Sequence, residues 1–185
     1  MEPLAKLFGS PARLKLLRLF FFNDDTTFTA NVAASRAKVS LALARKEIAM
    51  LFGAGILRKK TGAWTIDKRF AHHEPLLAFL RQTTALQDGV IVDTLKRAGN
   101  LRLIVLSGLF TGTIETKIDV LIVGDRLDER ALGQGVQKLE AELGRELRYA
   151  SFTTEDFKYR RGVYDRLLRD VFDYPRRVIL DKIGV

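Results

Sequence analysis

The chain has 185 residues, a net charge of +9 and no cysteine. The lack of cysteine excludes disulfides and thiolate metal sites, and it favours a reducing, cytoplasmic location. The apolar runs are too short to cross a bilayer and the first ten residues lack a signal-peptide pattern, so we expect a soluble protein that does not bind a membrane.

The positive charge is concentrated in the first part of the chain. Residues 1–84 contain 14 Lys and Arg against 6 Asp and Glu, whereas residues 85–185 contain 17 against 16. Because Lys and Arg release counterions when they neutralise phosphates, this asymmetry favours a nucleic-acid partner for residues 1–84. The alternative is a basic surface that faces only solvent. We expect two domains, 1–84 and 85–185.

Hydroxyl caps, glycines and apolar spacing divide the first domain into three helices and a hairpin. The predicted elements are a helix from Ser10-Pro11 to Asn23, a short helix from Thr29 to about Arg36, a third helix from Ser40 to about Phe52, and a hairpin from Ile56 to Ile66 with a basic turn at 58–62. Leu41, Ala44, Ile48 and Leu51 share one face of the third helix and are expected to pack on the first helix.

This order of elements, with the run from Ala44 through Gly55 to Leu57, resembles winged-helix transcription regulators of the ArsR and MarR kind over residues 4–67. The resemblance implies that the third helix enters the major groove of DNA and that the hairpin, the wing, lies over the backbone. The expected DNA contacts are Ser40, Leu43, Arg45, Lys46, Arg58, Lys59 and Lys60. Solvated surface is the alternative for each basic residue taken alone.

Pro75 to about Ala98 is predicted to be one long helix with a weak point at Asp88-Gly89. It either pairs with the same helix of a second copy, which would give a homodimer on a palindromic site, or packs on its own domain. His72 and His73 are adjacent but have no nearby third ligand, so we expect loop residues and no metal.

After Gly99 the pattern changes to strands that alternate with helices, which is typical of an α/β layer. The expected strands are 101–106, 118–123, 146–152 and 177–180, and the expected helices are 128–143, closed by Gly144, and 154–172, capped by Thr154. The fold class is therefore α+β: an N-terminal winged helix-turn-helix followed by a small α/β domain. An aromatic–basic stripe from Phe157 to Arg169 is expected to be a solvated face or a surface for nucleic acid or a partner.

The segment Leu101–Gly124 resembles the minimal nucleotidyltransferases, in which Gly-Ser-x-x-x-Gly precedes Asp-x-Asp and carboxylates hold magnesium. Ser107-Gly108 stands in the Gly-Ser place and Gly112 in that of the second glycine. Lys117 and Asp119 take the aspartate places, and Arg148 takes the third carboxylate's place. Because lysine repels a cation, the resemblance implies a nucleotidyltransferase-like domain with no catalytic residue, no metal and no cofactor.

Two interpretations of this cluster stay open. Its cations could hold an anion such as a nucleotide phosphate, with Ser107, Gly108, Gly112, Lys117, Asp119 and Arg148 as the site. Alternatively, Asp119 forms an internal ion pair and no ligand binds.

These observations predict a transcription regulator that binds double-stranded DNA as a homodimer, with an inactive second domain used for dimerisation, ligand sensing or partner docking. One alternative is an active nucleotidyltransferase of the antitoxin type that modifies a protein or an RNA. Another is an adaptor whose winged helix binds no DNA.

Overall fold

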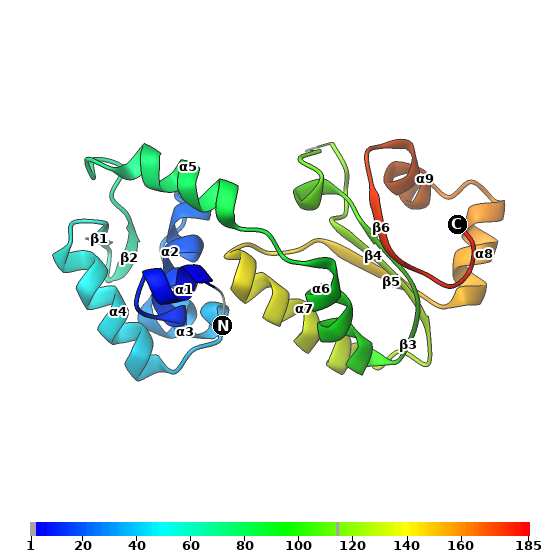
Figure 1. The fold of residues 1–185 in the computed structure, drawn as a ribbon, viewed down its shortest axis with the longest axis horizontal. Coiled ribbons are helices and arrows are strands. Elements are labelled where there is room, and N and C mark those ends of the chain that lie inside the picture. The colour runs from blue at the N-terminus through cyan, green and yellow to red at the C-terminus, as the bar shows by residue number, and fades with distance from the viewer. Residues whose placement is uncertain (1–2, 114) are drawn as a thin grey trace. The chain divides into compact units, whose positions relative to one another are not determined.

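The computed structural model describes residues 3–113 and 115–185, which form nine α-helices, two short 3₁₀ helices and two β-sheets (Figure 1). The fold is therefore mixed α and β, as expected. The chain forms two compact units: residues 1–86 with 137–145, and residues 87–136 with 146–185. No helix in the described residues is long and apolar enough to cross a membrane.

The first unit consists of helices around a small hairpin. Its elements are α1 (Pro3–Leu7), α2 (Pro11–Phe22), α3 (Ala30–Ala37), α4 (Leu41–Gly53), β1 (Leu57–Lys60), β2 (Ala63–Ile66) and α5 (His73–Thr83). The hydroxyls of Ser10, Thr29 and Ser40 each accept the N–H three residues on, at 3.3 Å, which confirms the three predicted helix starts.

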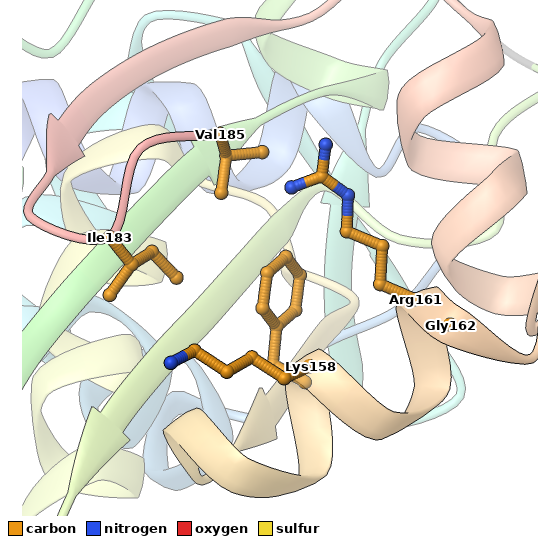
Figure 2. A pocket seen from close by; sticks show the side chains of 6 residues that line it. Lys158, Arg161, Gly162, Ile183 and Val185 are labelled. Carbon is orange, nitrogen blue, oxygen red and sulfur yellow. The ribbon is translucent and has the colours of Figure 1, made fainter.

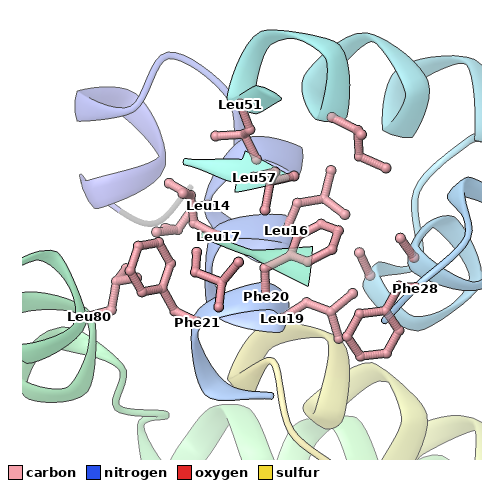
Figure 3. Packing of buried hydrophobic residues seen from close by; sticks show 14 of the residues in the cluster. Leu14, Leu16, Leu17, Leu19, Phe20, Phe21, Phe28, Leu51, Leu57 and Leu80 are labelled. Carbon is pink, nitrogen blue, oxygen red and sulfur yellow. The ribbon is translucent and has the colours of Figure 1, made fainter. Parts of the chain in front are cut away.

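The core of this unit is built around α2. Figure 3 shows that Leu14, Leu17 and Phe20 lie among apolar side chains from several elements, including Leu51 of α4 and Leu57 of β1. All five side chains are almost fully buried. Burial of each such side chain contributes about 1.5–3 kcal/mol, so this cluster fixes α4 and the hairpin relative to α2.

The hairpin is a tight antiparallel pair. Leu57 pairs with Ile66 and Lys60 with Ala63. The two residues between them, Thr61 and Gly62, both have positive φ, as a two-residue primed turn requires.

The end of α7 (Glu129–Leu143) also belongs to the first unit, although we expected this helix to lie wholly in the second domain. Lys15 Nζ lies 2.7 Å from Glu142 Oε1, and the Asn23 amide donates to the Gly144 carbonyl at 2.7 Å.

The second unit is a four-stranded sheet with helices on both faces. Its other elements are α6 (Asp88–Leu95), the 3₁₀ helix η1 (Lys96–Ala98), β3 (Asn100–Leu106), the 3₁₀ helix η2 (Gly108–Phe110), β4 (Val120–Asp125), β5 (Tyr149–Phe152), α8 (Thr154–Gly162), α9 (Arg166–Asp173) and β6 (Arg177–Asp181). The strand order is β5-β4-β3-β6. β3 is antiparallel to both neighbours, whereas β5 runs parallel to β4 after the crossover through α7.

Helices α8 and α9 cover one face of this sheet, opposite α6 and the first part of α7 (Figure 1). Phe157 of α8 and Leu168 and Val171 of α9 are buried in one cluster with Leu103 of β3 and Leu121 of β4.

Two predicted long helices are each divided in the structure. The helix expected over 75–98 is α5 and α6 with a non-helical segment between Thr83 and Asp88. Here the Thr83 hydroxyl bonds back to the Phe79 carbonyl at 2.7 Å, and threonine favours helices poorly. The helix expected over 154–172 is α8 and α9, since the Asp165 carboxylate caps a new start by accepting from Leu167 and Leu168 N–H.

Two local predictions were wrong. Thr153, not Thr154, caps α8, and its hydroxyl accepts from Asp156 N–H at 3.0 Å. His73 is not a loop residue, because it begins α5, is only 5% exposed and stacks on Phe21 with 5.4 Å between the ring centroids. An apolar partner therefore explains its burial.

Candidate functional site

Helix α4 presents one buried and one exposed face. Ala44, Ile48 and Leu51 are buried, as predicted, and Leu41 is half-buried. All seven expected DNA-contact residues are exposed: Ser40, Leu43, Arg45 and Lys46 on or beside α4, and Arg58, Lys59 and Lys60 on β1. The Ser40 hydroxyl already accepts from Leu43 N–H as the cap of α4. It can still donate its own hydrogen, and accept with its second lone pair, in a contact with DNA.

The cations on this surface have few acids near them. Within residues 3–113 and 115–185, no acid lies at ion-pair distance from Arg45, Lys46 or Lys60. Lys59 Nζ lies 5.9 Å from the centroid of the Trp64 ring, a cation–π contact. Arg58 is close enough to lower the pKa of Asp67, but Asp67 is mainly engaged by Arg69, whose hydrogen bonds hold that pKa at about 2.

An ion pair between a buried glutamate of α4 and a partly exposed arginine of α2 links the two helices. Glu47 is 3% exposed, and its Oε2 accepts from Arg13 Nε at 2.8 Å. Arg13 also donates from Nη1 to the Phe8 carbonyl at 2.7 Å. Glu47 follows Lys46 directly, so the ion pair anchors α4 next to its exposed basic residues. The pair has no signal in the sequence, because charged residues at helical spacing are usually solvated.

In the second unit, the acid of the nucleotidyltransferase-like motif is fully occupied by hydrogen-bond donors. Asp119 is 3% exposed. Its Oδ1 accepts from Arg148 Nη2 at 2.8 Å and from Leu109 N–H at 2.9 Å. Its Oδ2 accepts from Arg148 Nε at 3.1 Å and from Arg148 N–H at 2.9 Å.

These donors keep Asp119 ionised despite its burial. Burial opposes ionisation, but the Arg148 side chain and the N–H groups of Leu109 and Arg148 outweigh it, so the pKa of this carboxyl lies below its ordinary value. The same hydrogen bond raises the pKa of Arg148. The internal ion pair that the sequence left as one of two interpretations is therefore present.

Gly108 makes room for that ion pair. Its φ is +48°, and a Cβ placed there would collide with Asp119 Oδ1 and lie 2.9 Å from Thr116 Oγ1 and 3.1 Å from Arg148 Nη2. A serine in this position, as in the nucleotidyltransferase motif, would have to displace the pair. Thr116, which the sequence analysis did not single out, is buried here and donates to the Thr113 carbonyl at 3.2 Å.

The structure brings Gly108, Asp119 and Arg148 together, and the Ser107 N–H donates to the Asp119 carbonyl at 2.9 Å, whereas Gly112 and Lys117 lie apart from this cluster. Ser107 is buried, and its hydroxyl reaches only the Pro175 carbonyl, at 3.5 Å. Gly112 faces open space. Lys117 is exposed, and its backbone N–H, rather than its ammonium group, is held by Asp170 at 2.6 Å.

The donor set does not fit the magnesium ions that the nucleotidyltransferase resemblance implies. Hard cations need several carboxylate oxygens with free lone pairs. Asp119 is the one acid of the motif, and a guanidinium already engages both of its oxygens. Among the described residues, no three His, Asp or Glu side chains lie together in a way that could hold a metal ion.

Two hollows lie on either side of Arg161, at the end of α8. The first, of about 330 Å³, is lined by Phe157, Lys158, Gly162, Ile183 and Val185 together with Arg161 (Figure 2). The second, of about 400 Å³, lies between α8 and α9 and is more polar. Both are lined in part by the aromatic–basic stripe from Phe157 to Arg169.

No protein family, curated protein or solved structure matches this chain.

Proposed function

We propose that this chain is a DNA-binding transcription regulator whose first unit binds duplex DNA in the manner of a winged helix. The observation that carries the proposal is the exposed, basic face formed by α4 and β1. Arg45 and Lys46 lie on α4 and Lys60 lies at the end of β1, with no acid paired to them in the described part of the chain. Unpaired cations of this kind contribute binding free energy when they neutralise DNA phosphates, because counterions are released.

The shape of this surface supports the same assignment. The major groove admits an α-helix, and α4 has an uninterrupted exposed face opposite its buried residues. Arg45 would contact guanine or phosphate, and the wing lysines would contact the backbone. Because few side chains on this face form hydrogen bonds, we propose that shape contributes to sequence preference.

We further propose that the second unit has no catalytic role and serves for dimerisation, ligand sensing or partner docking. The bidentate contact of Arg148 with Asp119 supports this part of the proposal, since it engages both oxygens of the only acid in the motif. A dimer would match two α4 helices to the two halves of a palindromic site.

A pair of charge reversals tests DNA binding. The double variant Arg45→Glu and Lys46→Glu changes two exposed cations of α4, so duplex DNA should bind at least about tenfold more weakly in a fluorescence anisotropy titration. The matched control is Lys6→Glu with Arg81→Glu, which makes the same change in net charge at exposed positions of α1 and α5.

The control separates a binding surface from general electrostatics. The proposal expects the control to retain most of the affinity. Equal losses in both double variants would mean that only the net charge matters, and no loss in the α4 variant would leave the adaptor function as the better explanation.

A further inference from the structure

The hollow between α8 and α9 has an unusual concentration of arginine. Arg161 comes from α8, Arg169 from α9 and Arg176 from the segment after α9, and all three line one pocket of about 400 Å³. This volume falls in the range of about 300–1,000 Å³ that is typical of small-molecule sites.

The arginines surround an aromatic ring. The guanidinium carbons of Arg161 and Arg176 lie 6.0 and 5.1 Å from the centroid of Phe172. Arg176 is held in place, because its Nη1 donates to the Phe172 carbonyl at 2.6 Å. Cation–π contacts offset part of the repulsion between like charges, but they leave the positive potential of the pocket in place.

The acids of the pocket do not neutralise this charge fully. The Asp165 carboxylate accepts hydrogen bonds from the N–H groups of Leu167 and Leu168, and from Arg160 Nη1 at 3.1 Å. Asp173 forms an ion pair with Arg169 at 3.6 Å, but both side chains are more than half exposed, so solvent screens this pair. Arg161 also faces Asp181, but three backbone N–H groups already bond to that carboxylate.

Tyr164 presents a second aromatic ring at the rim. It lines the pocket, is 80% exposed and has φ +55° in the turn between the two helices. The left-handed conformation is strained for a bulky residue, and exposure of an aromatic ring gains nothing in folding. A strained backbone that holds an exposed ring beside three cations is an arrangement that suits a ligand with a planar group.

We propose that this pocket binds a nucleoside phosphate, either free or as an unpaired nucleotide of a nucleic acid. Arg161, Arg169 and Arg176 would hold the phosphate, and Tyr164 would stack on the base. Arginine and aromatic side chains are the groups that recognise unpaired nucleotides by charge and stacking. The site lies in the second unit and does not depend on duplex binding by α4.

Two matched pairs of variants test this assignment. Tyr164→Asn removes the ring but keeps a residue that tolerates positive φ, and Arg169→Ala removes an exposed cation. Their controls are Tyr159→Asn, an exposed tyrosine of α8 outside the pocket, and Arg166→Ala, an exposed arginine at the start of α9. Thermal unfolding followed by circular dichroism verifies that each variant is folded.

Binding of AMP and ATP is measured by isothermal titration calorimetry, with inorganic phosphate as the reference anion. A labelled oligothymidylate is titrated in the Arg45→Glu, Lys46→Glu background, so that α4 does not contribute to its binding. We expect each pocket variant to bind its ligand about tenfold more weakly than its control does. A loss seen with ATP alone identifies a free nucleotide as the ligand, and a loss seen with the oligonucleotide as well identifies an unpaired nucleotide of a nucleic acid.

Two results would overturn the assignment. One is binding of neither nucleotide nor oligonucleotide at millimolar concentration. The other is a lack of specificity, seen either as phosphate binding as tight as that of AMP or as equal losses in the pocket variants and their controls. Since the oligonucleotide is tested without a functional α4 surface, failure here leaves the proposed duplex binding untouched.

Discussion

Arg148 donates to both carboxylate oxygens of Asp119, from Nη2 at 2.8 Å and from Nε at 3.1 Å. Residue 148 is where the nucleotidyltransferase resemblance would place a third carboxylate. It is an arginine here, and it binds the carboxylate of Asp119. The Arg148–Asp119 contact links the residue that precedes β4 to the residue that precedes β5, with the carboxylate buried and the guanidinium half exposed.

Gly108 should be far less tolerant of a side chain than Gly112. Both have positive φ, but a Cβ at 108 would collide with Asp119, whereas a Cβ at 112 meets open space. We expect Gly112→Ala to cost about 1 kcal/mol for the left-handed conformation and Gly108→Ala about 2–4 kcal/mol with the added overpacking. Urea denaturation gives both values, and equal costs would show that the ion pair does not fill the space beside Gly108.

Replacement of Arg148 should make the protein less stable in a way that depends on pH. Arg148→Met leaves Asp119 buried with only its two backbone donors, and we expect a loss of about 1–3 kcal/mol at neutral pH, moderated because Arg148 is half exposed. The lowered pKa of Asp119 means that its contribution is present above its ordinary pKa and disappears as pH falls through the folded value.

The stability difference between wild type and Arg148→Met should therefore stay nearly constant at neutral pH and shrink only as pH falls below the ordinary pKa of Asp119 and through its lower folded value. Urea denaturation from about pH 7 to about pH 3 measures it. The matched variant Arg102→Met breaks a pair with Asp125, whose carboxylate is far more exposed than that of Asp119, and should cost about 1 kcal/mol or less. A difference for Arg148→Met that stays constant with pH would contradict ionisation of Asp119 as its origin.

The two partners of the Arg13–Glu47 pair should differ in their cost of removal. Arg13→Met leaves a buried carboxylate without its cation, and we expect a loss of about 2–4 kcal/mol. Glu47→Gln keeps an oxygen that can accept from Arg13, which is about a third exposed, so about 1 kcal/mol should be lost. Chemical denaturation measures both, and a larger loss for Glu47→Gln would show that desolvation does not govern this pair.

The second unit should not transfer nucleotides. Incubation with labelled ATP and either magnesium or manganese should leave all protein and RNA unlabelled, because Asp119 cannot act as a ligand while Arg148 engages it. Transfer of label to any acceptor would instead support the active nucleotidyltransferase of the antitoxin type.

Much of the first unit could be predicted because its signals are local. A hydroxyl at positions 10, 29 and 40, followed by an apolar spacing of three to four residues, marks each helix start within the sequence itself. The hairpin was also predicted, but its turn was placed too widely at 58–62, because Arg58, Lys59 and Lys60 pair in β1 and only Thr61 and Gly62 form the turn. The contribution of 137–145 to this unit could not be predicted, since it depends on long-range contacts such as Lys15 with Glu142.

The divided helices show where periodicity is insufficient. Leu77 and Leu80 lie in the core of the first unit, whereas Ile91 and Leu95 are buried in the second. Apolar spacing identifies both faces but does not say that they pack into different cores. At the α8–α9 break, Asp165 caps the start of α9. Aspartate is a common N-cap residue, but here it lay inside the predicted helix over 154–172.

The candidate site was predictable in its chemistry but only partly in its geometry. Asp119 with a neighbouring cation followed from the motif, and the structure selects Arg148 as its partner. Lys117, adjacent in the motif, is exposed instead, because the backbone N–H of residue 117 is fixed by Asp170 of α9. That contact joins residues far apart in the chain and leaves no local signal.

The central claim, that α4 and the hairpin bind DNA phosphates, is tested most directly by the salt dependence of duplex binding. Each phosphate neutralised contributes a slope of about −0.9 to a plot of log affinity against log salt concentration. With Arg45, Lys46 and Lys60 engaged, we predict a slope of about −3 or steeper for each copy bound, and a slope shallower by about 2 in the Arg45→Glu, Lys46→Glu variant. An affinity for duplex DNA that is the same at low and at physiological salt would contradict the account.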